Sequence, residues 1–130
     1  MDCLVEFFTP KGELLYELIK ISKNAEQQKA TKVFSKIEQS INLPLRALIN
    51  YGSASSGEKL AGILQALNIG RVIGQRSLSK GTSMNPVSVA SFFDEDVSVM
   101  TYSSRHEYLL PGEVKVEGVG VTPDLSLIHI

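Results

Sequence analysis

The sequence feature that most constrains the fold is a strand–turn–helix–strand pattern between residues 43 and 81. The apolar run at residues 43–49 is short and ends in Asn-Tyr-Gly, which is typical of a buried strand that meets a tight turn. Apolar side chains then recur at helical spacing, so a helix is expected to begin near Ser55 or Ser56. A second short apolar run at residues 71–74 predicts the next strand.

The turn before this helix is a place where a hydroxyl could react. The Ser55 side chain would lie beside the unpaired amides of the first helical turn, and these amides favour the negative charge of an acyl-transfer oxyanion. Lys80 follows the second strand closely enough to act as the base for such a serine. Residues 55–58, Ser-Ser-Gly-Glu, are also an S-x-x-E capping box, the ordinary way to begin a helix. Spacing alone favours the cap over the nucleophile, because such caps are common at helix starts.

Composition excludes several classes of function. The chain has 130 residues, which is enough for one core and too few for two comfortable domains. Its net charge is −1, so neither nucleic acid nor an anionic membrane is expected as a partner. No apolar run approaches the length of a membrane span, and the N-terminus lacks a signal-peptide pattern. The single cysteine, Cys3, excludes an intramolecular disulfide.

Several motifs resemble those of one enzyme family. Residues 52–58, Gly-Ser-Ala-Ser-Ser-Gly-Glu, are similar to the G-[ST]-A-S-[AS]-[SG]-E signature of the C-terminal-processing (tail-specific) serine proteases. That family places its nucleophile three residues before the glutamate, here Ser55, and its lysine 25 positions later, here Lys80. Residues 61–65 resemble the family's A-G-A-L-Q helix, and residues 117–124 resemble its closing Q-G-V-G-I-x-P-D motif.

The resemblance implies an α/β fold with a ClpP/crotonase-like core, a mixed β-sheet and flanking helices, incomplete in this chain. Residues 1–130 would form the C-terminal portion of a peptidase catalytic domain, without its N-terminal half and PDZ module. By the same resemblance Ser55 is the nucleophile, Lys80 is the general base and the Ser56 amide is one oxyanion-hole donor. Glu58 would cap the helix and orient the site.

The function that the resemblance implies is hydrolysis of peptide bonds near the C-termini of proteins, through an acyl-enzyme. The implied partners are protein or peptide substrates, and the truncated core is expected to self-associate. No cofactor and no metal are expected. The resemblance suggests the bacterial periplasm or cell envelope, or another exported compartment.

The role of general base sets a chemical requirement on Lys80. A lysine accepts a proton only when its amine is neutral, so desolvation must lower the pKa of Lys80 far below its usual value. Val72, Ile73 and Leu78 are suitable apolar neighbours. A solvent-exposed lysine is the ordinary alternative. His106 is the competing base, since histidine is the commonest one, although it stands in a polar, turn-like stretch and is expected to be exposed.

Three positions depart from the family pattern and leave the Ser55–Lys80 pair intact. Met84 stands where the family often has a glutamine that hydrogen-bonds the lysine, Ala66 replaces a usual aspartate, and Ser79 replaces the first glycine of G-K-G. Met84 favours the main rival, a non-catalytic relative that binds protein C-termini, whereas the spacing of Ser55 and Lys80 favours the enzyme. A third alternative is an unrelated α/β interaction domain with a capped helix.

The rest of the chain carries weaker signals. Residues 13–22 suit a helix or a strand, with the resemblance favouring a strand, and residues 24–39 predict a surface loop or hairpin. Residues 87–92 and 97–101 predict a hairpin with an acidic tip. The tip residues Asp94-Glu95-Asp96 could bind a metal, but adjacent carboxylates on a hairpin tip are more often solvated.

Overall fold

The computed structural model describes residues 2–22, 30–92 and 97–126. It contains two helices and eight strands in these ranges. They are α1 (Asp2–Glu6), β1 (Leu14–Lys20), β2 (Ala30–Phe34), β3 (Leu45–Ile49), α2 (Ser56–Ala66), β4 (Gly70–Gly74), β5 (Thr82–Phe92), β6 (Val97–Leu110), β7 (Val114–Lys115) and β8 (Leu125–Ser126).

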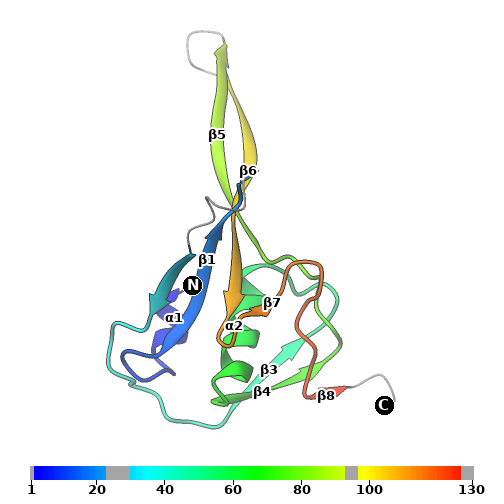
Figure 1. Cartoon of the computed structure of the whole chain (residues 1–130). Helices are drawn as coiled ribbons and strands as arrows, with labels where there is room; N and C mark the ends of the chain where they lie inside the picture. Colours follow the sequence, from blue (N-terminus) through cyan, green and yellow to red (C-terminus); the bar gives the residue numbers. More distant parts are fainter. Residues whose placement is uncertain (1, 23–29, 93–96, 127–130) are drawn as a thin grey trace.

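The strands form two sheets with α2 packed between them (Figure 1). One sheet is antiparallel, in the order β2-β1-β6-β5, and β7 pairs with β6. The other is parallel, in the order β3-β4-β8. The core joins both sheets to the helix through the buried side chains of Leu15, Ile63, Val72 and Leu110. The α/β class predicted from the sequence is confirmed, and the parallel and antiparallel strands are segregated.

The predicted strand–turn–helix–strand unit is present. β3 begins at Leu45, just after Pro44, which has no N–H to give to a sheet. α2 begins at Ser56 and crosses back so that β4 pairs parallel to β3. Asn68 has a left-handed backbone with φ of 55°, as is common just after the end of a helix.

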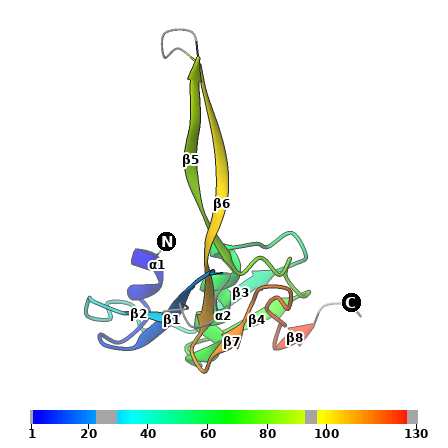
Figure 2. The same ribbon diagram turned by 45° about the horizontal axis from the view of Figure 1, so that its top comes forward.

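The β5–β6 hairpin projects away from the body of the molecule (Figures 1 and 2). The predicted hairpin is therefore confirmed, and its strands are longer than the sequence pattern indicated. The expectation of turn-like structure around His106 is wrong, because His106 lies within β6, opposite Lys20 of β1 and Ser83 of β5. Strands on both sides satisfy the backbone there, so a polar sequence remains extended. The acidic tip at residues 93–96, with its metal alternative, lies outside the described residues.

The N-terminal segments also follow the expectations. The ambiguous segment at 13–22 contains strand β1, and β2 pairs with it as an antiparallel hairpin.

None of the described helices has the length and apolar character needed to cross a membrane. In the same described ranges, no three histidine, cysteine or acidic side chains gather as a metal site would require.

The closing motif is attached to the core through Asp124. Its backbone N–H donates to Val72 O at 2.8 Å, and its carboxylate accepts from Val72 N at 2.7 Å and from Gln65 Nε2 at 2.8 Å. The hydrogen bond from Val72, together with that from Gln65, lowers the pKa of the Asp124 carboxyl. These hydrogen bonds hold the closing motif, residues 117–124, against β4 and α2.

Candidate active site

Ser55 has a backbone conformation that a helix cap does not explain. It directly precedes α2 with φ of 53° and ψ of −111°, whereas an N-cap residue is ordinarily extended. A positive φ is uncommon for a residue with a Cβ atom, and such strained residues gather at functional sites. A sharp, strained strand-to-helix turn is the arrangement that exposes the serine nucleophile of α/β-hydrolases. The capping interpretation therefore accounts for only part of the local structure.

Glu58 joins this turn to the segment that contains Lys80. Its side chain is fully buried in the first turn of α2. Oε2 accepts hydrogen bonds from Ser55 N at 2.8 Å and Lys80 N at 2.9 Å, and Oε1 accepts from Ser77 Oγ at 2.5 Å and Ser79 N at 2.6 Å. The bond from Ser55 N is the glutamate half of a capping box, while the other three bonds reach across to the approach to β5.

We call residues 75–81, between β4 and β5, the lysine segment. The closing motif is hydrogen-bonded to this segment. Ser77 N donates to Val121 O at 3.2 Å, and Val121 N donates to Ser77 Oγ at 2.7 Å. The segment is also joined to the turn before α2, where Leu78 N donates to Ser53 O at 2.9 Å. The backbone that presents Lys80 is thus held from two directions.

The two residues beside Lys80, which resemble the flanking glycines of a G-K-G pattern, differ in their backbone and in the space around them. Ser79 has φ of 78°, a backbone region that glycine adopts more easily, so the serine here is strained. Gly81 has no room for a side chain, because a Cβ atom there would lie 2.3 Å from Glu117 N. Gly81 N also donates to the Glu117 carboxylate at 2.6 Å. The departure at Ser79 therefore costs backbone strain.

Ser55 and Lys80 line the same pocket, which has a volume of about 270 Å³. Its other lining residues come from the start of α2 and from the base of the β5–β6 hairpin: Ser56, Lys59, Thr82, Ser83, Met84, Tyr102 and Tyr108. The hydrogen bonds and ion pairs of the described residues include none between Ser55 Oγ and Lys80 Nζ, and none that occupies Lys80 Nζ. Catalytic hydrogen bonds are often loose before substrate binds.

The predicted oxyanion donor also lies at this pocket. Ser56 is the first residue of α2, where backbone amides have no carbonyl partner within the helix. Among the backbone hydrogen bonds of the described residues, Gly57 N donates to Ala54 O and Lys59 N donates to Ser55 O, and none uses Ser56 N. Its N–H is therefore available to a ligand.

His106 is not brought to Ser55. It is half-buried within β6 and does not line the pocket. His129 lies outside the described residues. Of the two candidate bases considered in the described part of the chain, the structure brings only Lys80 to the pocket that Ser55 lines.

Sequence reasoning did not single out Tyr108. Its hydroxyl lies 3.0 Å from Ser55 O and 3.2 Å from Lys80 O, and its ring lies 5.7 Å from Lys59 Nζ. Burial, reinforced by the nearby carboxylates of Glu58 and Glu117, raises the pKa of the phenol well above its usual value. No local motif surrounds this tyrosine, so its role becomes visible only when β6 is placed beside α2.

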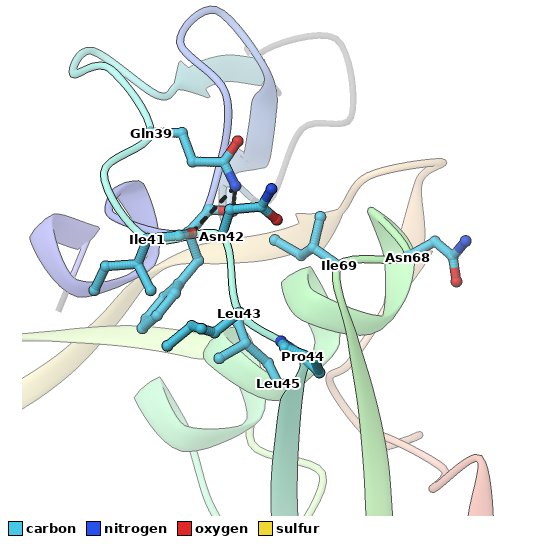
Figure 3. A pocket seen from close by; sticks show the side chains of 9 residues that line it. Gln39, Ile41, Asn42, Leu43, Pro44, Leu45, Asn68 and Ile69 are labelled. Atoms are coloured by element: carbon cyan, nitrogen blue, oxygen red, sulfur yellow. Dashed lines mark hydrogen bonds between the residues drawn. The ribbon is translucent and has the colours of Figure 1, made fainter.

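A larger cavity of about 470 Å³ lies elsewhere, at the ends of β3 and α2 (Figure 3). Its walls include Leu43, Pro44 and Ile69, and the Gln39 amide bridges Phe8 O and Ile41 O at 3.3 Å and 3.2 Å. Its lining side chains include no nucleophile and no ionisable group. Chemistry of the kind predicted for Ser55 therefore belongs to the smaller pocket.

Comparison with known proteins points to one family. The model described as peptidase family S41 matches residues 4–127. The chain is 31% identical over 105 residues to "C-terminal processing peptidase, chloroplastic" of Tetradesmus obliquus, covering 79% of this chain and 21% of that protein. It is 30% identical over 124 residues to the "Probable CtpA-like serine protease" of Staphylococcus saprophyticus, covering 95% of this chain and 23% of that protein.

Solved structures share the fold. The photosystem II D1 C-terminal processing protease matches with a TM-score of 0.70 at 24% identity, covering 97% of this chain and 30% of that one. A lipoprotein from Streptococcus agalactiae matches with a TM-score of 0.72 at 14% identity, covering 98% and 44%. The chain spans between about a fifth and a quarter of the length of the two curated relatives.

Proposed function

The chain belongs to peptidase family S41, and from this premise we propose that it is the C-terminal portion of a serine peptidase catalytic domain in which Ser55 is the nucleophile and Lys80 the general base. The share of the curated relatives that it spans supports the assignment to part of a domain. Protein or peptide substrates, cleaved near their C-termini, are the proposed targets, by analogy with the relatives' names.

One observation carries this proposal. A single carboxylate oxygen, Glu58 Oε2, accepts the backbone N–H of Ser55 at 2.8 Å and that of Lys80 at 2.9 Å, and both side chains line one pocket. Two residues separated by 25 positions are thus held in a fixed relation by a buried group. A helix cap alone requires no such connection to Lys80.

The proposed reaction begins with attack of Ser55 Oγ on the scissile carbonyl carbon. The neutral amine of Lys80 takes the hydroxyl proton, and the Ser56 N–H stabilises the oxyanion that forms. The Lys80 ammonium then returns a proton to the leaving amine, so the peptide bond breaks and an acyl-enzyme remains. Water attacks the ester, Lys80 again takes and returns a proton, and the free Ser55 is restored. A second oxyanion donor would come from the N-terminal half of the domain.

A non-catalytic relative that binds protein C-termini is the alternative. Met84 favours it, because this residue lines the pocket beside Lys80 where a glutamine would hold the amine. A thioether is only a weak acceptor and donates no hydrogen bond. A binding protein could keep the pocket and lose only the reaction.

The test is labelling of the full-length protein by a fluorophosphonate, combined with peptide hydrolysis across pH. Labelling and hydrolysis should be lost in Ser55→Ala. Both should fall to a small residual level in Lys80→Ala and in Lys80→Arg, because alanine carries no base and guanidinium cannot be deprotonated near neutrality. Ser83→Ala is the matched control, since it removes a hydroxyl from the same pocket at a residue with no proposed part in the reaction. The rate should rise with pH, because only a neutral amine can accept the hydroxyl proton.

Two results would change the assignment. Undiminished labelling in Lys80→Ala, or lost labelling in His106→Ala, would transfer the role of base to His106. Absence of labelling in every protein, with C-terminal peptides still bound, would favour the non-catalytic relative.

A further inference from the structure

We propose that Tyr108 is a positioning residue. Its hydroxyl donates to the backbone carbonyls of Ser55 and Lys80 and thereby fixes the two residues relative to one another. The proposal rests on the function proposed above. It concerns a residue of β6 that lies far from the signature motif in sequence.

The contacts of the phenol carry the proposal. Its hydroxyl lies 3.0 Å from Ser55 O and 3.2 Å from Lys80 O, so its one proton is shared between the carbonyls of the two residues. Tyr108 is only 3% exposed, so little water is available to replace the hydrogen bonds that its hydroxyl donates. Burial raises the pKa of the phenol, which favours the neutral hydroxyl as a hydrogen-bond donor.

Tyr108 and Glu58 complement one another. Glu58 accepts the N–H of Ser55 and of Lys80, whereas Tyr108 donates to the C=O of the same two residues. Each residue is thereby fixed at both of its peptide groups. A strained conformation such as that of Ser55 persists only where its surroundings determine it on several sides. The two buried side chains together supply this constraint.

The phenol can be tested without disturbing its surroundings. The Tyr108 backbone N–H donates to Gly81 O at 2.9 Å, a bond that does not depend on the side chain. The ring also lies beside the Lys59 ammonium, and a phenylalanine ring would preserve this contact. Tyr108→Phe therefore removes one hydroxyl from the site.

The experiment compares Tyr108→Phe with Tyr102→Phe in the full-length protein. Tyr102 lines the same pocket and is 63% exposed, so it provides the matched control. For Tyr108→Phe we expect kcat and the rate of Ser55 labelling to fall by roughly 10- to 100-fold, as small misplacements of reacting groups do, with KM within about twofold. Tyr102→Phe should retain the wild-type kcat. A wild-type kcat in Tyr108→Phe would overturn the proposal.

A second arm separates positioning from a general loss of structure. In a Lys80→Ala background, Tyr108→Phe should cause no further fall in residual labelling, because the pair that it aligns is already broken. A further fall of similar size would show that the hydroxyl acts elsewhere, and would refute the proposal.

Amide hydrogen exchange provides a readout that does not require catalysis. Tyr108→Phe should increase exchange in the peptides that cover residues 55–59 and 80–82, with β1 unchanged as a measure of the fold. Tyr102→Phe should change neither. Unaltered exchange at both segments would contradict the positioning role. If the wild type is not labelled at all, the proposed function fails, while this exchange result still decides the role of Tyr108.

Discussion

Replacement of Glu58 by glutamine is the most informative perturbation of this site. The change keeps the shape of the side chain and removes its charge and one acceptor atom. In the structure all four groups around the carboxylate are donors: the N–H groups of Ser55, Ser79 and Lys80 and the hydroxyl of Ser77. The NH₂ of a glutamine must therefore face at least one donor.

The least costly orientation sets the expected magnitude. If the amide oxygen keeps the N–H groups of Ser55 and Lys80, the NH₂ faces Ser77 Oγ and Ser79 N. The hydroxyl can rotate to accept, but the Ser79 N–H loses its partner. Loss of one hydrogen bond to a charged group costs about 1.5–3 kcal/mol. We therefore expect a local destabilisation of about 2–3 kcal/mol, before any repulsion between the facing donors.

Amide hydrogen exchange measures this cost where it arises. At about 1.36 kcal/mol per tenfold change, protection of the peptides that cover residues 55–58 and 77–81 should fall by roughly 30- to 150-fold in Glu58→Gln. Glu38→Gln is the control, because Glu38 is exposed and its ion pair with Lys11 contributes little. Peptide hydrolysis should fall together with the protection. Protection in Glu58→Gln within about twofold of that in the control would refute the view that Glu58 holds the two segments together.

Three further changes give distinct outcomes. Ser79→Gly should raise the unfolding midpoint, with a gain of about 0.5–1 kcal/mol from relieved strain at φ of 78°, whereas Ser79→Ala should give none. Met84→Gln should keep or increase the rate of peptide hydrolysis by providing a hydrogen-bond partner for Lys80; a clear fall would count against Lys80 as the base. The depressed pKa of Asp124 predicts stability that is present above the ordinary value of 3.8 and lost as pH falls through the lower folded value. Acid titration of unfolding should show this component in the wild type and not in Asp124→Asn.

The local parts of the fold and site could be predicted from the sequence. Periodicity indicated the β3–α2–β4 unit, and the motif at residues 52–58 indicated the family that the match over residues 4–127 confirms. These features depend on neighbours in sequence: an apolar run, a turn and a helix start. The same motif identified Glu58 as a helix cap, and the structure adds its bonds to the lysine segment.

The remaining features depend on contacts between segments far apart in sequence. β6 continues through the polar residues around His106, because β1 and β5 pair with it on either side. Tyr108 belongs to the site only because β6 passes beside the start of α2. The local sequence pattern predicts neither feature, because the preference of a segment for a strand depends strongly on the strands and side chains that pack beside it. The left-handed backbone of Ser79 could be suspected only from the first glycine of the G-K-G pattern that residues 79–81 resemble.

The parallel sheet leads to a last prediction, which concerns its second face. α2 packs on one face of β3 and β4, and within the described residues the opposite face leaves Leu48 76% exposed, with Leu125 also exposed. Parallel sheets are ordinarily covered on both faces, so we expect the rest of the proposed catalytic domain to lie there.

The 130-residue chain expressed alone should then self-associate, and Leu48→Lys should weaken this association. In the full-length protein the same change should destabilise, because it removes about 1.5–3 kcal/mol of leucine burial. Val114→Lys, at an exposed position of β7, is the control for both measurements. Sedimentation of the isolated chain and thermal unfolding of the full-length protein would reveal the opposite effects, and a full-length protein indifferent to Leu48→Lys would show that this face stays open.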